Sequence, residues 1–336
     1  GTDESLLEAK HYFDNNCTNY SNGEYSIADN VISIPGLPYF DGEYTAGYSG
    51  YSCQPKMRSV TSGKWGTSGT WEEWNATTSS WVPATSAPNG NEVTICSGHE
   101  VTIEGNGKSA YSVNIEQGAK LVVGTTFLHS LGLISGGGTI SLTALAPISI
   151  GEASSFKLPA GDYTEFFDNV NSTLIFDNGN HNATLSEQPG NYYKPFNIVE
   201  FTGSGKTTVT ALSFYAKGNV TIHSGCRLDN ATNNRPFYVG GNLIDENTGE
   251  TGYICGTSQV IFNGTSPQTV TLSTDAKFYD LKILNATGVT LAQGDIEVSN
   301  KLTLETGNFI TKDDALIRLT STNTAVVVGG STESFV

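Results

Sequence analysis

The chain has 336 residues, with 17 Lys and Arg against 33 Asp and Glu, which gives a formal net charge of −16. Nucleic-acid binding requires a basic face that neutralises phosphates, so nucleic acid is excluded as an expected partner. No run of about 18 apolar residues occurs, and no membrane span is expected. Glycine is abundant and only 15% of the residues are charged, and with frequent β-branched residues this composition predicts a mostly β fold.

The N-terminal part of the chain differs from the rest. Residues 5–15 predict a short helix with apolar side chains along one face, whereas residues 20–50 are rich in Tyr, Gly and Pro without a period. A repetitive fold must cover its first unit, and an atypical terminal segment commonly does so. We therefore predict that residues 1–60 form an N-terminal cap or a small separate module.

All four tryptophans follow in one short stretch, as Trp65, Trp71, Trp74 and Trp81. Exposed indole rings would form a platform on which sugar rings stack, which makes the four side chains candidate carbohydrate-binding residues. The alternative is that the rings cover the apolar end of the first repeat unit, and we favour this second interpretation.

One pattern recurs in the remainder of the chain: two apolar residues flanking any residue, a glycine three positions later, and another apolar residue three positions after that. It occurs at residues 93–101, 113–121, 220–228 and 302–310. Apolar side chains two residues apart point to one face of a strand. The glycine then marks a tight corner that needs unusual backbone angles.

The spacing of this pattern predicts a solenoid. Residues 196–228 also align without a gap onto residues 278–310. This shift and the shifts between the other occurrences are close to whole multiples of about 20–21 residues, a usual length for one coil. We predict a right-handed parallel β-helix over residues 61–336 that continues beyond them. Its stacked, buried column would contain Val93, Ile95, Val113, Ile115, Val220, Ile222, Leu302 and Leu304. The alternative, a pair of antiparallel β-sandwiches, gives no reason for a gapless repeat.

Several motifs follow one another at the start of this region: G-x-W at 63–65, T-W-x-x-W-N at 70–75, W-V-P at 81–83 and V-T-I-x-x-G-H-x-V-T-I at 93–103. This order resembles the opening of β-solenoid modules in large proteins of Bacteroidota that the type IX system secretes. The stretch is more loosely similar to the G8 domain. The resemblance implies an extracellular, cell-surface location. Such modules occur in adhesins, in gliding-associated proteins and in carbohydrate-active enzymes.

Five cysteines are present, and their spacing matches neither a zinc site nor a Cys-x-x-Cys motif. Cys17 with Cys53, and Cys226 with Cys255, are candidate disulfides, which leaves Cys96 over. The alternative is that all five are reduced and buried.

The sequence offers no assembled catalytic set. No histidine pair has the spacing of a zinc site, and neither a nucleophile elbow nor a phosphate-binding loop occurs. The pair Asp313 and Asp314 lacks the flanking residues of polygalacturonase-like enzymes. Acidic corners such as residues 245–247 could hold calcium through oxygen ligands, but a solvated turn is the favoured interpretation. No catalytic residue, metal site or cofactor is predicted.

We therefore expect an extracellular structural or adhesive segment, such as part of a stalk, filament or adhesin, without catalytic activity. The alternative is a carbohydrate-active enzyme or carbohydrate-binding module on a β-helix. Glycans are candidate partners, although the sequence does not name the ligand. An open strand edge around residues 325–336 would also allow self-association by strand addition.

Overall fold

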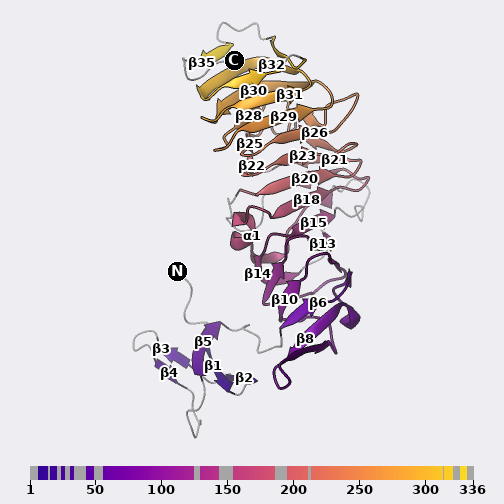
Figure 1. The fold of residues 1–336 in the computed structure, drawn as a ribbon, viewed down its shortest axis with the longest axis vertical. Coiled ribbons are helices and arrows are strands. Elements are labelled where there is room, and N and C mark those ends of the chain that lie inside the picture. Colours follow the sequence, from indigo (N-terminus) through magenta and orange to yellow (C-terminus); the bar gives the residue numbers. More distant parts are fainter. Residues whose placement is uncertain are drawn as a thin grey trace.

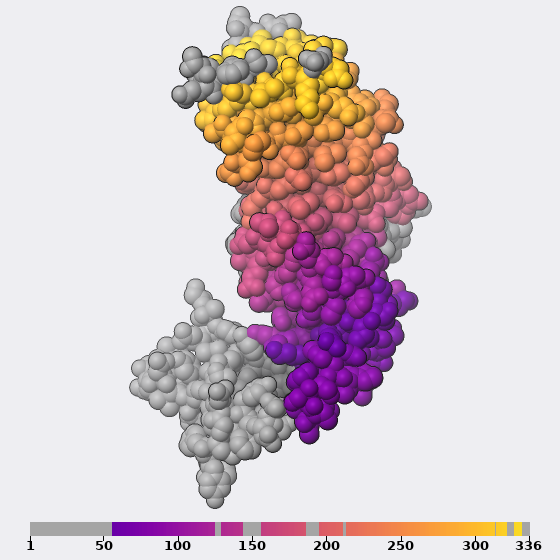
Figure 2. Space-filling model, viewed as in Figure 1, coloured from indigo at the N-terminus to yellow at the C-terminus, as the bar shows by residue number. Residues whose placement is uncertain are grey.

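In the computed structural model the chain winds into a parallel β-solenoid of about ten turns, which confirms the predicted β-helix (Figure 1). The coils form an elongated body that runs from the indigo to the yellow end of the chain (Figure 2). The structure describes residues 56–124, 129–143, 154–185, 195–210, 213–312, 314–320 and 326–330, and the backbone of five strands before them. Within these residues, no helix has the length and apolar character needed to cross a membrane.

The five N-terminal strands pair in antiparallel fashion, β1 with β2 and β5, and β3 with β4. The predicted helix at residues 5–15 is therefore wrong, because β1 occupies most of that segment. The residues Leu7, Ala9, His11 and Phe13 alternate with polar or charged neighbours, and a run this short fits a strand as well as a helix. The bounds are β1 (Leu7–Phe13), β2 (Asn16–Tyr20), β3 (Glu24–Ser26), β4 (Val31–Ser33) and β5 (Glu43–Tyr48).

The first coils contribute to a seven-stranded sheet, here called the N-terminal sheet, with the order β17-β14-β12-β10-β6-β8-β9. Its coil strands are parallel, but β8 and β9 run antiparallel and extend the sheet past the first coil. The tryptophan segment thus lies where a cap is needed. The bounds are β6 (Met57–Ser59), β8 (Trp71–Asn75), β9 (Ser80–Pro83), β10 (Glu92–Ile95), β12 (Ser112–Ile115), β14 (Ser130–Ser135) and β17 (Ala160–Asp162); two short helices are η2 (Ser68–Thr70) and α1 (Thr164–Asp168).

An eleven-stranded parallel sheet, here called the spine, runs through the whole solenoid from β7 to β33. Each of its strands pairs with the strand of the next coil, so backbone hydrogen bonds are satisfied between coils rather than within them. The bounds are β7 (Gly63–Lys64), β11 (Glu100–Ile103), β13 (Lys120–Gly124), β15 (Thr139–Thr143), β18 (Thr173–Asp177), β20 (Ile198–Thr202), β23 (Val220–Ile222), β26 (Leu243–Asp245), β29 (Gln268–Leu272), β31 (Val289–Gln293) and β33 (Phe309–Thr311).

Two further parallel sheets complete the later coils. The side sheet contains β16 (Ser154–Ser155), β19 (Ala183–Leu185), β21 (Lys206–Val209), β24 (Arg227–Asp229) and β27 (Tyr253–Ile254). The C-terminal sheet contains β22 (Phe214–Ala216), β25 (Phe237–Val239), β28 (Gln259–Phe262), β30 (Ala276–Leu284), β32 (Ile296–Thr306), β34 (Ile317–Leu319) and β35 (Val327–Gly329), of which β34 and β35 both pair with β32.

The core confirms the burial predicted from the repeat pattern. The eight predicted column residues are at most 4% exposed, because alternation in each short strand sends every second side chain inward. Aromatic rings from successive coils contact one another inside, as where Phe176 stacks on Phe201 with ring centroids 5.3 Å apart. The four motif glycines have positive φ angles of 80° to 90°, which supports their role as corners.

The predicted single column is nevertheless wrong. Ile222 lies on β23 in the spine, whereas Leu304 lies on β32 in the C-terminal sheet. Successive coils differ in length, and pairing through four of them leads from Val199 to Leu291, whereas the gapless match aligns Val199 with Leu281. The match therefore does not span a whole number of coils. The motif marks a strand–corner–strand unit that the chain uses at different corners of its cross-section.

Candidate functional site

Two of the four tryptophans are core residues. Trp65 and Trp71 are 0% and 1% exposed, and their rings meet edge to face with centroids 5.3 Å apart. The Trp65 Nε1 donates to the Pro88 carbonyl at 3.2 Å, and the Trp71 Nε1 donates to the Trp65 carbonyl at 2.9 Å. Neither ring presents a face to solvent, so the prediction that these two tryptophans stack on sugars is wrong. They instead fill the cap of the first coil, as the alternative interpretation expects.

The other two tryptophans lie half-buried on the outer face of the N-terminal sheet. Trp74 is directly opposite Trp81 across β8 and β9, and their rings pack edge to face at 5.5 Å. The Arg58 guanidinium lies 4.4 Å from the centroid of the Trp81 ring and donates to Glu72 at 2.9 and 3.1 Å. This cluster stabilises the hairpin, and Trp74 and Trp81 stay predicted carbohydrate contacts.

The candidate disulfide between Cys226 and Cys255 is wrong, because both thiols are free. In the register that pairs Leu228 with Tyr253, Cys226 lies beside residue 251, four positions short of Cys255. That offset corresponds to roughly 13 Å along a strand, and a disulfide needs Cα atoms within about 7 Å. Cys96 is also free, while the other predicted pair, Cys17 and Cys53, lies outside the side chains that the structure describes.

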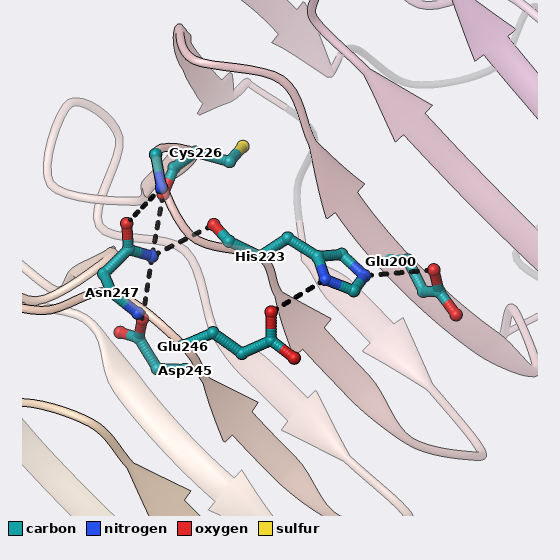
Figure 3. Close-up of polar contacts among 7 residues, drawn as sticks. Glu200, His223, Cys226, Asp245, Glu246 and Asn247 are labelled. Carbon is teal, nitrogen blue, oxygen red and sulfur yellow. Dashed lines mark hydrogen bonds and ion pairs between the residues drawn. The ribbon is translucent and has the colours of Figure 1, made fainter.

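The most distinctive polar arrangement on the solenoid is a histidine between two glutamates, each on a different coil (Figure 3). His223 follows β23, Glu200 lies in the middle of β20, and Glu246 follows β26. The His223 Nε2 is 3.1 Å from the Glu200 carboxylate, and Nδ1 is 2.9 Å from the Glu246 carboxylate. All three side chains are about one third to one half exposed. We call this group the clamp.

Register explains why these side chains meet. Glu200 pairs with Thr221, and Ile222 pairs with Asp245, so His223 and Glu246 are level while Glu200 is diagonal to them. Side chains two residues apart share a face, so all three project from the outer face of the spine. The sequence carries this arrangement as an equal spacing between successive members, 23 positions in each case. This spacing has a meaning only in relation to the coil lengths, so the sequence alone does not predict the three side chains as a group.

The turn that carries His223 is fixed by an amide from the next coil. The Asn247 Nδ2 donates to the carbonyls of His223 and Cys226 at 3.2 and 3.0 Å, and its Oδ1 accepts from the Gly225 N–H at 2.9 Å (Figure 3). Asn247 is 7% exposed. Buried amides with their donors and acceptors satisfied hold a backbone rigidly, so the imidazole leaves the turn from a fixed position.

The electrostatics of the clamp favour a charged imidazole. Burial by itself would lower the pKa of His223, but the hydrogen bonds and negative charges of Glu200 and Glu246 outweigh it, so the pKa lies above its usual value. Neutral imidazole has one donor and one acceptor, whereas a carboxylate only accepts. Two close carboxylate contacts therefore require both ring nitrogens to carry protons.

The predicted acidic corner at residues 245–247 is neither a solvated turn nor an open set of oxygen ligands. The Asp245 side chain is buried and accepts hydrogen bonds from the N–H groups of Gly252 and Tyr253 at 2.7 and 3.2 Å. The Thr251 hydroxyl donates to it as well. In the described part of the chain, no group of three or more His, Cys, Asp or Glu side chains has the geometry to hold a metal ion. Asp313, of the acidic pair considered from the sequence, falls outside that part.

A serine–histidine contact occurs near the first corner. The Ser59 Oγ is 2.8 Å from the His99 Nδ1 and accepts a hydrogen bond from the Cys96 N–H. A nucleophile beside a base is the arrangement used in acyl transfer, but Ser59 is 2% exposed and faces the core. The contact thus serves to satisfy the polar groups of the corner.

Comparison with known proteins identifies no relative: no family model, no curated protein and no solved structure matches the chain. The resemblance to secreted Bacteroidota modules accordingly depends on the sequence motifs alone.

Proposed function

We propose that this chain is a rigid structural or adhesive segment of an extracellular surface protein, with the coils acting as a spacer. The observation that carries the proposal is the pattern of ion pairs on the outside. Ten of those among the described residues join a side chain on one coil to a side chain on the adjacent coil. These pairs link neighbouring coils in three stretches of the solenoid, at residues 56–120, 200–250 and 277–318.

The core supports the same proposal. Large side chains fill the interior from the first tryptophans to Phe309, and the spine continues without interruption beside them. About ten coils at ~4.8 Å each give a rod roughly 50 Å long. A close-packed interior transmits strain and resists compression, which suits a segment that holds a binding surface away from a cell.

A second candidate function is carbohydrate binding at Trp74 and Trp81. Their half-exposed rings, next to the charged pair of Arg58 and Glu72, combine a stacking surface with hydrogen-bonding groups. The predicted self-association also stays a proposal. Val327 and Val328 of β35 are 47% and 41% exposed, and strand addition there would cover them.

The test combines shape with binding. Small-angle scattering of the chain should give a rod-like profile, and a polysaccharide array should show binding without release of shortened products. Trp74→Ala should reduce any binding, with Tyr215→Ala on the outer face of the C-terminal sheet as the matched aromatic control. Turnover of a polysaccharide would contradict the non-catalytic proposal, and a compact or flexible scattering profile would contradict the spacer.

A further inference from the structure

We propose that the Glu200–His223–Glu246 clamp makes the cohesion of three consecutive coils depend on pH, with the coils held more tightly as the medium becomes more acidic. The inference concerns contacts between coils and does not depend on what the rod binds. It starts from the geometry: one imidazole lies within hydrogen-bond distance of carboxylates on both neighbouring coils.

The clamp exists in full only when the ring is doubly protonated. After loss of one proton the ring keeps a single N–H, so it can donate to one glutamate only. The other nitrogen then directs a lone pair at a carboxylate about 3 Å away, which is repulsive. Deprotonation thus removes one of the two hydrogen bonds through which His223 links its own coil to the neighbouring coils.

The surroundings leave His223 as the group that responds. The charges that raise its pKa belong to Glu200 and Glu246. Other charged side chains on the surrounding strands and turns are Asp177, Lys206, Arg227, Asp229, Asp245 and Glu250; of these, Lys206 pairs with Asp229 and Arg227 with Glu250. Asp245 points into the core and is held by backbone donors.

The sign of the effect follows from linkage. Because the folded state raises the pKa of His223, the stabilisation is fully present below the unfolded pKa of about 6.5 and is lost as the pH rises through the folded value. A shift of one pKa unit corresponds to about a tenfold change in an opening equilibrium. Since the side chain is one third exposed, roughly threefold to tenfold is the expected range.

The experiment measures amide hydrogen exchange of the whole chain at pH 5.5 and pH 8.5, expressed as protection factors. In the wild type, β23 and β26 should be roughly three to ten times better protected at pH 5.5, beyond any change in the distant strand β13. His223→Gln should abolish this difference. His181→Gln, which removes a histidine at a turn two coils before that of His223, should keep it. An equal pH response in His223→Gln would overturn the proposal.

A second measurement covers the case in which His223→Gln does not fold. Nuclear magnetic resonance of the imidazole nitrogens gives the pKa of His223 directly in folded protein. It should exceed about 6.5 in the wild type and fall in Glu246→Gln, whose side chain lies near the surface. A wild-type pKa at or below about 6.5, or no change in Glu246→Gln, would refute the clamp.

Discussion

Lys206 and Asp229 join neighbouring coils of the side sheet, and the lysine Nζ donates to the aspartate Oδ2 at 2.8 Å. The Asp229 side chain is only 6% exposed, whereas that of Lys206 is 41% exposed. Burial alone would raise the pKa of Asp229, but the hydrogen bonds from Lys206 and Thr232 outweigh it and hold the pKa below its usual value. A nearly buried carboxylate thus depends on a cation from the preceding coil.

Replacing Lys206 by Met should destabilise the protein by about 1–3 kcal/mol, because the Asp229 charge stays buried without its cation. Urea midpoints at pH 7 measure the effect. The control is Lys277→Met, which removes an exposed partner of Glu297 and should cost less than about 0.5 kcal/mol. Equal losses in both variants would contradict this prediction.

The same ion pair predicts a response to acid. Because the folded state lowers the pKa of Asp229, its stabilisation is present above the unfolded pKa of about 3.9 and is lost as the pH falls through the folded value. The pH dependence of the urea midpoint below about pH 4 should therefore be shallower in Asp229→Asn than in the wild type. Identical acid profiles would show that Asp229 is not the group responsible.

Removing a buried cap tryptophan should be far more costly than removing a surface one. Trp71→Ala deletes a fully buried ring and should lower the free energy of unfolding by about 3–5 kcal/mol. Trp74→Ala removes a half-buried ring from the same strand and should cost about 1 kcal/mol. Chemical denaturation compares the two. Similar losses would mean that the first coil does not depend on the buried pair.

Corner glycines should differ according to the space around them. Gly307 has a φ of 80°, and a Cβ there would collide with the Asn285 carbonyl, so Gly307→Ala should cost more than about 2 kcal/mol. Gly98 has the same φ but open space, and its alanine variant should cost about 1 kcal/mol. Gly69→Ala, with neither constraint, should be nearly neutral. Thermal denaturation would rank the three variants by loss of stability. Any order other than Gly307, Gly98 and Gly69 would contradict the predicted collision at Gly307.

Thiol labelling checks the free cysteines. Burial raises the pKa of the Cys226 thiol to about 11 and also raises that of Cys255, so both should react slowly with maleimide in native protein. Cys96 is less buried and should react first. In denaturant without reductant, all three should be labelled. A peptide linked through Cys226 and Cys255 in a non-reducing digest would refute the free-thiol assignment.

The solenoid could be predicted from the sequence because its corner requirements are local. A strand with two inward side chains followed by a glycine at positive φ is recognisable wherever it occurs, and Gly98, Gly118, Gly225 and Gly307 all have that conformation. Which corner each glycine turns depends on pairing between coils, and that information is not local. The sequence therefore predicts the fold class correctly, but it does not show that Leu304 belongs to a different sheet from Ile222.

The clamp illustrates the same limit for sites. Glu200, His223 and Glu246 meet only because the lengths of two coils bring them to one face of the spine. Alternation within each strand sets the face of each side chain, and the pairing register between coils sets which side chains meet. A lone histidine and two glutamates carry no local pattern. The tryptophans are the opposite case, since their clustering drew attention but could not distinguish buried Trp71 from half-exposed Trp74.

The spine has a consequence for how the molecule would respond to mechanical tension. Its interstrand hydrogen bonds lie along the stacking axis, because each strand pairs with the one in the next coil. A force that pulls the two ends apart would load these bonds one coil at a time rather than all together. Each coil that peels away would release roughly 70 Å of extended chain. Under tension the rod would therefore lengthen in discrete steps, each corresponding to the unfolding of one coil.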